Sequence, residues 1–131
     1  MSAFSVHVGA AFLIPSGTQQ NPSEKHMFVV CTDLDNNGVA VLASISSWKN
    51  NLCDGTCKLD PGCHPFVRKP SYVLYRKSRI EHGDILLRGL ERAVFIPLDD
   101  VKPELLEQIK DGLLKSKQTP WQVKRYLKNN N

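Results

Sequence analysis

Short apolar stretches separated by turn-forming residues dominate the first part of the chain. Residues 6–14, 27–32 and 39–46 are rich in aliphatic and β-branched side chains, which is typical of strands. Residues 35–38, between the last two stretches, read Asp-Asn-Asn-Gly, and an Asn-Gly pair supplies the positive φ angles that a tight hairpin needs. The pattern therefore predicts an antiparallel hairpin. Further strands are predicted at residues 72–80, 85–87 and 93–96.

Side-chain alternation assigns the residues of these strands to two faces. In the stretch 39–46 one face carries Val39, Val41, Ala43 and Ile45, and the other carries Ala40, Leu42, Ser44 and Ser46. In the stretch 72–80, Tyr72 shares a face with Leu74, and Tyr75 shares the opposite face with Val73. At most one of these two tyrosines is therefore expected to be exposed on the side of the basic residues.

Two amphipathic segments near the C-terminus predict helices at residues 102–116 and 119–128. Thr119 and Gln122 form a capping-box pattern at the start of the second, which is an additional basic helix. The expected packing positions are Leu105, Leu106, Ile109 and Leu113 in the first helix and Trp121, Val123, Tyr126 and Leu127 in the second. Strands followed by helices predict a single α+β domain over residues 1–131, mainly β, with a small β-barrel-like sheet closed by the C-terminal helices.

The segment 47–70 interrupts this pattern of strands. It has no clear periodicity and contains five turn-forming residues, Gly55, Pro61, Gly62, Pro65 and Pro70. Loops of this length are uncommon in small domains and are often functional. We therefore expect the functional residues to gather in and around this loop.

Composition and charge narrow the classes of protein that fit. The chain has 131 residues, of which 41% are hydrophobic, enough for one core without disulfides. Neither a signal peptide nor a span of about 20 apolar residues is recognisable, so we expect a cytoplasmic protein that does not enter a membrane and keeps its four cysteines reduced. The net charge is +4, and five Lys/Arg without an acid lie within residues 67–79. Such local basic stretches indicate a polyanionic partner.

Four segments carry a resemblance to the MazF/PemK family of toxins. His26-Met27-Phe28-Val29-Val30 is similar to the family's Arg-Pro-x-Val-Val strand, with His26-Met27 in the place of Arg-Pro. Ser44-Ile45-Ser46-Ser47 lies where the family has a strand ending in Thr or Ser. Ser71-Tyr72-Val73 followed by Arg79-Ile80 resembles a later strand, and residues 101–114 resemble the closing helix. The resemblance extends over roughly residues 8–115.

The resemblance implies an SH3-like barrel and an endoribonuclease that cleaves single-stranded RNA without a metal or other cofactor. It also implies a homodimer and an antitoxin protein as partner. In the family, the loop before His26 carries phosphate-binding groups, and Lys25 and His26 are the candidates for that role in this chain.

The residues themselves suggest where such chemistry would lie. Cleavage of RNA requires a proton acceptor for the 2′-hydroxyl, a proton donor for the leaving oxygen and a cation for the phosphate. His64 is the expected acid or base, Arg68 the phosphate clamp and Ser47 an auxiliary hydrogen-bond donor. The residues expected to bind RNA are Lys25, His26, Lys49, Lys69, Tyr72, Tyr75 and Arg76.

Three alternatives remain open. His64 would be structural if it were a turn residue beside Pro65, and the tyrosines would be structural if they were core residues. Cys53, Cys57, Cys63 and His64 together have the ligand types of a zinc site, which would exclude His64 from catalysis. The protein would then be a zinc-stabilised adaptor. A catalytically inactive nucleic-acid- or protein-binding module on the same fold is the third alternative.

Overall fold

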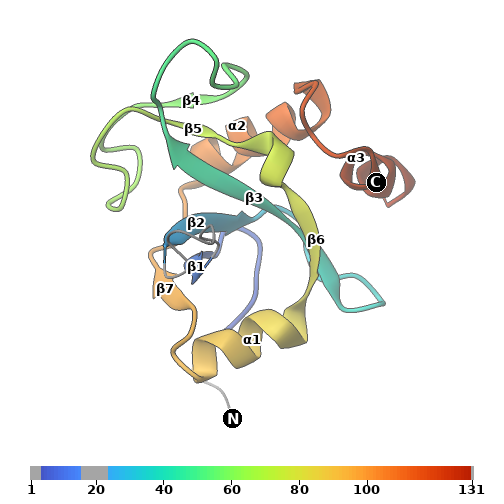
Figure 1. Ribbon diagram of the computed structural model, residues 1–131. Helices are drawn as coiled ribbons and strands as arrows, with labels where there is room; N and C mark the ends of the chain where they lie inside the picture. The colour runs from blue at the N-terminus through green and yellow to red at the C-terminus, as the bar shows by residue number, and fades with distance from the viewer. Residues whose placement is uncertain (1–3, 16–23, 131) are drawn as a thin grey trace.

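The computed structural model describes residues 4–15 and 24–130, which form an α+β structure around one antiparallel sheet (Figure 1). Within these residues the strands are β1 (Ala11–Pro15), β2 (Lys25–Val30), β3 (Val39–Ser47), β4 (Lys58–Leu59), β5 (Ser71–Val73), β6 (Arg79–His82) and β7 (Ile96–Leu98). The helices are α1 (Gly83–Glu91), α2 (Pro103–Lys115) and α3 (Trp121–Asn129), with a 3-10 turn η1 at Tyr75–Lys77. No helix in the described residues is long and apolar enough to cross a membrane.

Strand β3 organises the sheet because both of its edges are paired. One edge pairs with β2, and the other pairs with β6 along its first half and with β5 along its second half. The sheet order is β4-β5-β3-β2-β1-β7, with β6 beside β3. Over the described residues no pairing joins the two ends of this order, so the sheet is open and a closed barrel is not confirmed.

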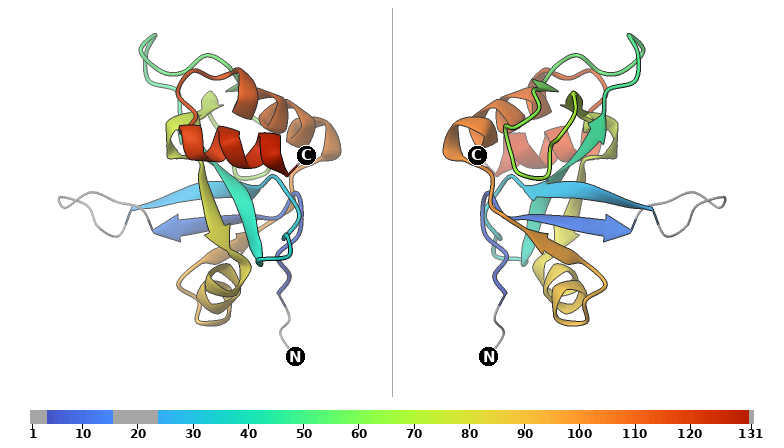
Figure 2. Two further views of the ribbon diagram at one scale, coloured as in Figure 1. Left: turned by 90° about the vertical axis from the view of Figure 1, so that its right-hand side faces the viewer. Right: turned by 90° about the vertical axis from the view of Figure 1, so that its left-hand side faces the viewer.

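Each face of the sheet has its own core, and the helices lie on opposite sides (Figure 2). Helices α2 and α3 cover the face that includes Met27, Val29, Val41, Ala43 and Ile45. Helix α1 covers the other face through Leu86 and Leu90, which pack with Phe12, Phe28, Val30 and Leu42. The observed faces of β3 are those predicted from its alternation.

The hairpin and the two C-terminal helices are confirmed. Gly38 adopts a φ of +76°, and the Asp35 carboxylate accepts hydrogen bonds from the amides of Asn37 and Val39. The Tyr126 hydroxyl donates a 2.7 Å hydrogen bond to the same carboxylate, and this contact fastens α3 to the hairpin turn.

Several predictions about local structure are wrong. Residues 85–87 belong to α1 and not to a strand, because Leu86 and Leu90, four residues apart, are buried while Ile85 is exposed. The predicted strand 72–80 is interrupted by η1, and the last strand lies at 96–98 and not at 93–96.

The start of α3 also differs from its prediction. Pro120 is the N-cap, and among the described residues the buried Thr119 hydroxyl has no hydrogen-bond partner, so the capping box does not form. Trp121 is 63% exposed and is therefore not a packing residue.

Tyr75 and Gly112 set how closely α2 approaches the sheet. Tyr75 is fully buried, and its hydroxyl donates a 2.8 Å hydrogen bond to the Ile109 carbonyl oxygen. Burial raises the pKa of this hydroxyl, so it remains the donor. A Cβ atom on Gly112 would overlap the Tyr75 hydroxyl, and glycine is therefore required where the helix crosses the ring.

We predict that Gly112→Ala lowers the free energy of unfolding by about 2–3 kcal/mol, because the helix must move away from Tyr75. Denaturant titration followed by circular dichroism measures this change. Gly55→Ala is the matched control, because its Cβ would lie 3.7 Å from the Lys58 Cε, an ordinary contact. Equal stability of the two variants would contradict the proposed fit between α2 and Tyr75.

Candidate nucleic-acid interface

A groove lies on the sheet face that α1 covers only in part. Its floor is made by consecutive positions on one face of β2 and β3, where Phe28 is opposite Ser44, and by Tyr72 of β5, which is opposite Ser46. His26 continues the same face of β2 and also lines the groove. This first groove has a volume of about 720 Å³. The face changes from apolar to polar here because the alternation of β3 ends in Ser44 and Ser46.

The loop that follows β3 forms one wall of the first groove. The ring of Trp48 packs edge-on against Tyr72 with the ring centroids 5.6 Å apart, and the Lys58 ammonium lies 4.5 Å from the Trp48 centroid. Lys49, Asn50, Leu52, Cys53 and Asp54 also line this groove. Leu52 is 90% exposed, so it offers an unburied apolar surface at the groove.

Asp54 fastens this loop to the junction between α2 and α3. Its carboxylate accepts 2.6 Å hydrogen bonds from the hydroxyls of Ser116 and Thr56 and a third from the Thr56 amide. Burial acts to raise the pKa of Asp54, but these hydrogen bonds outweigh it and the net shift is downward. Asp54 is therefore a buried anion whose carboxylate is bonded within the protein. Its role is to hold the loop and not to bind a ligand in the groove.

A second groove of about 540 Å³ lies beside the start of β2 and the end of β3. It is lined by residues of the other sheet face. Met27, Ile45 and Ser47 contribute from β2 and β3. Lys25, Phe66, Val67, Arg68, Lys69 and Ser71 complete its lining, together with residues shared with the first groove. Ser47 and Arg68, which the sequence predicts to act together, therefore line the same groove.

The two grooves are strongly basic. Six lysines and arginines line one or both of them, against the two acids Glu24 and Asp54: these cations are Lys25, Lys49, Arg68, Lys69, Arg76 and Lys77. All six side chains are exposed, and none forms an ion pair with an acid among the described residues. Unpaired cations along a concave surface attract a polyanion, since binding requires no existing ion pair to break.

Four residues line both grooves and so mark where they meet: Glu24, His26, Ser46 and Lys49. His26 Nε2 lies 3.5 Å from a carboxylate oxygen of Glu24, and the two side chains are 28% and 45% exposed. We call these four residues the junction. The sequence predicts His26 and Lys49 as RNA-binding residues but gives no role to Glu24 or Ser46.

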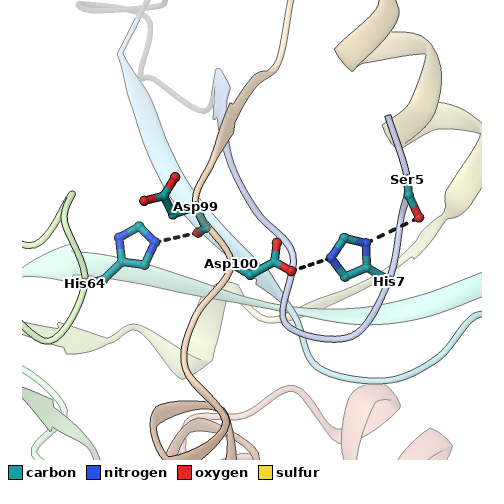
Figure 3. A network of polar contacts seen from close by, with 5 residues as sticks. All are labelled: Ser5, His7, His64, Asp99 and Asp100. Atoms are coloured by element: carbon teal, nitrogen blue, oxygen red, sulfur yellow. Dashed lines mark hydrogen bonds and ion pairs between the residues drawn. The ribbon is translucent and has the colours of Figure 1, made fainter. Parts of the chain in front are cut away.

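His64 lines neither groove and is held by the backbone. Its Nε2 donates a 2.6 Å hydrogen bond to the Asp99 carbonyl oxygen, and its Nδ1 accepts one from the Phe66 amide (Figure 3). The side chain is buried, with 4% of the residue exposed. These contacts leave neither nitrogen available to a substrate, and they correspond to the structural alternative for His64 and not to the catalytic one.

The two tyrosines separate as the alternation predicts. Tyr72 lines the first groove although only 7% of the residue is exposed, whereas Tyr75 is a core residue bonded to α2 and is not available to RNA. Arg76, one residue further on, is exposed and lines the first groove with Lys77. Lys77 is thus a groove residue that the predicted set lacks, although it lies in the basic stretch 67–79.

The cysteines do not converge with His64 as zinc ligands would. In the part of the chain that the structure describes, no group of three or more His, Cys, Asp or Glu side chains is placed to hold a metal ion. Cys57 is a core residue, Cys63 packs against the same core, and Cys53 lines the first groove. All four cysteines are free thiols.

Comparison with known proteins adds no family assignment: no protein-family model and no curated protein matches this sequence. A concave, cationic surface with an aromatic side chain in its floor is suited to an extended polyanion such as single-stranded nucleic acid.

We predict that His64→Ala lowers the free energy of unfolding by about 2–3 kcal/mol, since it removes two hydrogen bonds and buried contacts. His82→Ala, at an exposed histidine, is the matched control and should leave stability within about 0.5 kcal/mol. Thermal and denaturant unfolding measure both. A His64→Ala variant that is as stable as the parent but loses activity on RNA would return His64 to a catalytic role.

Cys53 lines the first groove, so the reactivity of its thiol depends on whether the groove is occupied. Hydrogen bonding from the backbone of Asn50 and Lys49 lowers the pKa of this thiol, whereas burial raises the pKa of Cys57 and Cys63, and that of Cys31 to about 12. A lower pKa gives more thiolate at neutral pH and faster alkylation.

We therefore predict that iodoacetamide modifies Cys53 first and that bound single-stranded RNA slows this reaction, as measured by peptide mass spectrometry. Cys53→Ser should abolish the fast phase. Preferential labelling of Cys63 would contradict the arrangement of the loop.

Proposed function

We propose that the protein is a toxin-like endoribonuclease of the MazF/PemK type that binds single-stranded RNA in the two grooves and cleaves it without a metal. The observation that carries the proposal is the pair of basic grooves that meet at the junction. Six exposed cations line them and have no acidic partner in the part of the chain that the structure describes; they come from the start of β2, from the loop after β3 and from both sides of β5. These cations are far apart in the sequence, so only the folded chain brings them together, and they do not belong to one charged segment.

Single-stranded RNA suits this surface better than a duplex does. A flexible strand can follow a concave path around the ends of β2 and β3, and its phosphates can then meet cations in both grooves. The exposed Leu52 supplies apolar surface in the first groove, where an unpaired base can be received, and the buried Tyr72 lies in the floor of this groove. Arginine binds phosphate in a bidentate manner, and one arginine lies in each groove, Arg76 in the first and Arg68 in the second.

The finer parts of the proposal follow from the resemblance. The pairing of β3 with β2 on one edge and with β5 and β6 on the other supports an SH3-like arrangement, although the sheet is open. A homodimer and an antitoxin remain part of the proposal. An antitoxin with an acidic segment would compete with RNA, because both would use the same cations.

A second candidate is a binding module on the same fold that does not cleave RNA. It is favoured by the position of His64, because the imidazole expected to act as acid or base is buried and bonded to the backbone. Both candidates require RNA to bind in the grooves. They differ only in whether the bound strand is cut.

We predict that the double substitution Arg76→Ala with Lys77→Ala weakens binding of a labelled, mixed-sequence single-stranded RNA at least tenfold. It should also lower the slope of log Kd against log salt by about 1–2, since phosphate contacts are lost. Fluorescence anisotropy over a range of salt concentrations measures both effects.

The matched control is Arg88→Ala with Arg92→Ala, which removes the same charge from exposed positions at α1, outside both grooves. Equal weakening by the two double variants would show a non-specific charge effect and would contradict the proposed site. Incubation of the parent protein with RNA in the presence of a chelator then separates cleavage from binding alone.

A further inference from the structure

We propose that the first groove holds an adenine base between the side-chain amides of Asn50 and Gln118. This inference rests on the proposed function and deepens it, because it names the base that a bound strand places in this groove. Gln118 lies beyond residues 8–115, over which the resemblance extends, so the site is a feature of this chain. The recognised group is the adenine base of a nucleotide, which a strand of RNA or a free nucleotide can supply.

Two side-chain amides line the first groove, and both are open to a ligand. Asn50 belongs to the loop after β3, and Gln118 lies in the segment between α2 and α3. Both residues are exposed. Within the described residues, neither the side chain of Gln118 nor the NH2 group of Asn50 forms a hydrogen bond. Their hydrogen-bonding capacity is therefore available to a bound base.

A chain of buried hydrogen bonds fixes Gln118 relative to the loop. The main-chain amide of Gln118 donates a 3.0 Å hydrogen bond to Ser116 Oγ, and this hydroxyl donates a 2.6 Å hydrogen bond to the Asp54 carboxylate. Ser116 and Asp54 are buried, so water does not compete for these bonds. Asp54 follows Asn50 by four residues in the same loop. The fold thus holds both amides on one side of the groove.

Asn50 is oriented by the turn of its own loop. Its Oδ1 accepts a 2.8 Å hydrogen bond from the Leu52 amide, and its carbonyl oxygen accepts a 3.0 Å hydrogen bond from the Cys53 amide. Oδ1 has a second lone pair, so it can accept another hydrogen bond from a base. The same turn leaves Leu52 exposed at the groove, where a flat base can cover it and remove its apolar surface from water.

Two amides favour adenine over the other bases. Each amide presents one donor beside one acceptor, and it binds a base edge that presents the complementary pair. Adenine has such a pair on two edges, N6 with N7 and N6 with N1. Guanine has two acceptors on its Hoogsteen edge, and cytosine and uracil have a complementary pair on the Watson–Crick edge only. Adenine is therefore the base that both amides can bind at once through these edges.

The cations of the first groove bind phosphate and do not select the base. Lys49, Arg76 and Lys77 line this groove, and none of them has an acidic partner among the described residues. Contacts to phosphate add affinity for every nucleotide and carry no information about the base. Affinity and base preference are therefore separate properties of the groove, and different residues determine them.

The test measures how tightly the full chain binds short 2′-O-methyl strands that differ at one base. Each strand is a uridine tract with A, G, C or U at its centre, and the methyl groups prevent cleavage during the measurement. Two further strands carry 7-deazaadenine, which lacks the N7 acceptor, or purine, which lacks the N6 amino group. Competition by AMP, GMP, CMP and UMP shows whether a free nucleotide is also bound.

The variants are Gln118→Ala and Asn50→Asp. Asn50→Asp keeps an oxygen that accepts the Leu52 amide, so the loop keeps its turn, but it lacks the NH2 donor. The matched controls are Gln122→Ala and Asn51→Asp, which make the same changes at exposed positions that line neither groove.

We expect the parent to bind the strand with A at least about tenfold more tightly than the strands with G, C or U, as bidentate pairing to a base edge provides. Replacement of A by 7-deazaadenine or purine should weaken binding at least about fivefold. Gln118→Ala and Asn50→Asp should each reduce the preference for A to less than about threefold. Gln122→Ala should change nothing, and Asn51→Asp should lower all four affinities by the same factor, because its charge acts on the phosphates.

The inference and the proposed function fail in different ways. Equal binding of the four strands by the parent would overturn the inference and leave RNA binding in the grooves in place. A preference for A that both Gln118→Ala and Asn50→Asp retain would also overturn it, because the base would then be recognised elsewhere.

The competition with nucleotides identifies the source of the base. Competition by AMP that Gln118→Ala abolishes would support the site and show that a free nucleotide occupies it, whereas a preference confined to the strands would support it with RNA as the source. Absence of binding of every strand by the parent would overturn the proposed function. Absence of AMP binding as well would then overturn the inference too.

Discussion

The pairing of β3 along both edges is the constraint on which the rest of the structure depends. Because β6 and β5 share one edge of β3, the chain between them must turn at η1, and this turn places Tyr75 under α2 and Arg76 in the first groove. The other edge of β3 holds β2 in register, which places His26 near Ser46. The pairing of β3 therefore positions the core beneath α2, helix α2 itself and the floor of the first groove.

The grooves exist because the sheet is longer than the helices that cover it. Along one face of β3, Ala40 and Leu42 are buried against α1, and the same face continues into Ser44 and Ser46, which line the groove. The cations around this polar end have no acidic partners among the described residues, so their mutual repulsion is relieved only when an anion binds. Asp54, which is bonded to Ser116 and Thr56, keeps the adjoining loop in place without neutralising them.

The parts of the fold that depend on local pattern were predictable. The Asn-Gly hairpin, the faces of β3, the separation of Tyr72 from Tyr75 and the two C-terminal helices all follow from spacing and turn chemistry. Helix α1 was not predictable in this way, because a run of three apolar residues at 85–87 suits a strand as well as a helix. Among the predicted site residues, Lys25, His26, Ser47, Lys49, Arg68, Lys69, Tyr72 and Arg76 line the grooves, whereas His64 and Tyr75 do not. The burial of His64 and Tyr75 depends on contacts with Asp99 and Ile109, respectively. Contacts between residues so far apart in the chain leave no pattern in the local sequence.

The central claim is that RNA binds around the strand ends where the two grooves meet, and amide chemical-shift mapping tests it most directly. A short 2′-O-methyl RNA is titrated into the isotope-labelled protein. The account predicts shifts at residues 24–28, 44–53 and 66–77, with α1 and α3 little changed. Shifts confined to α3, where Arg125 lies over the exposed Trp121, would contradict it and would place the nucleic acid on the basic C-terminal helix instead.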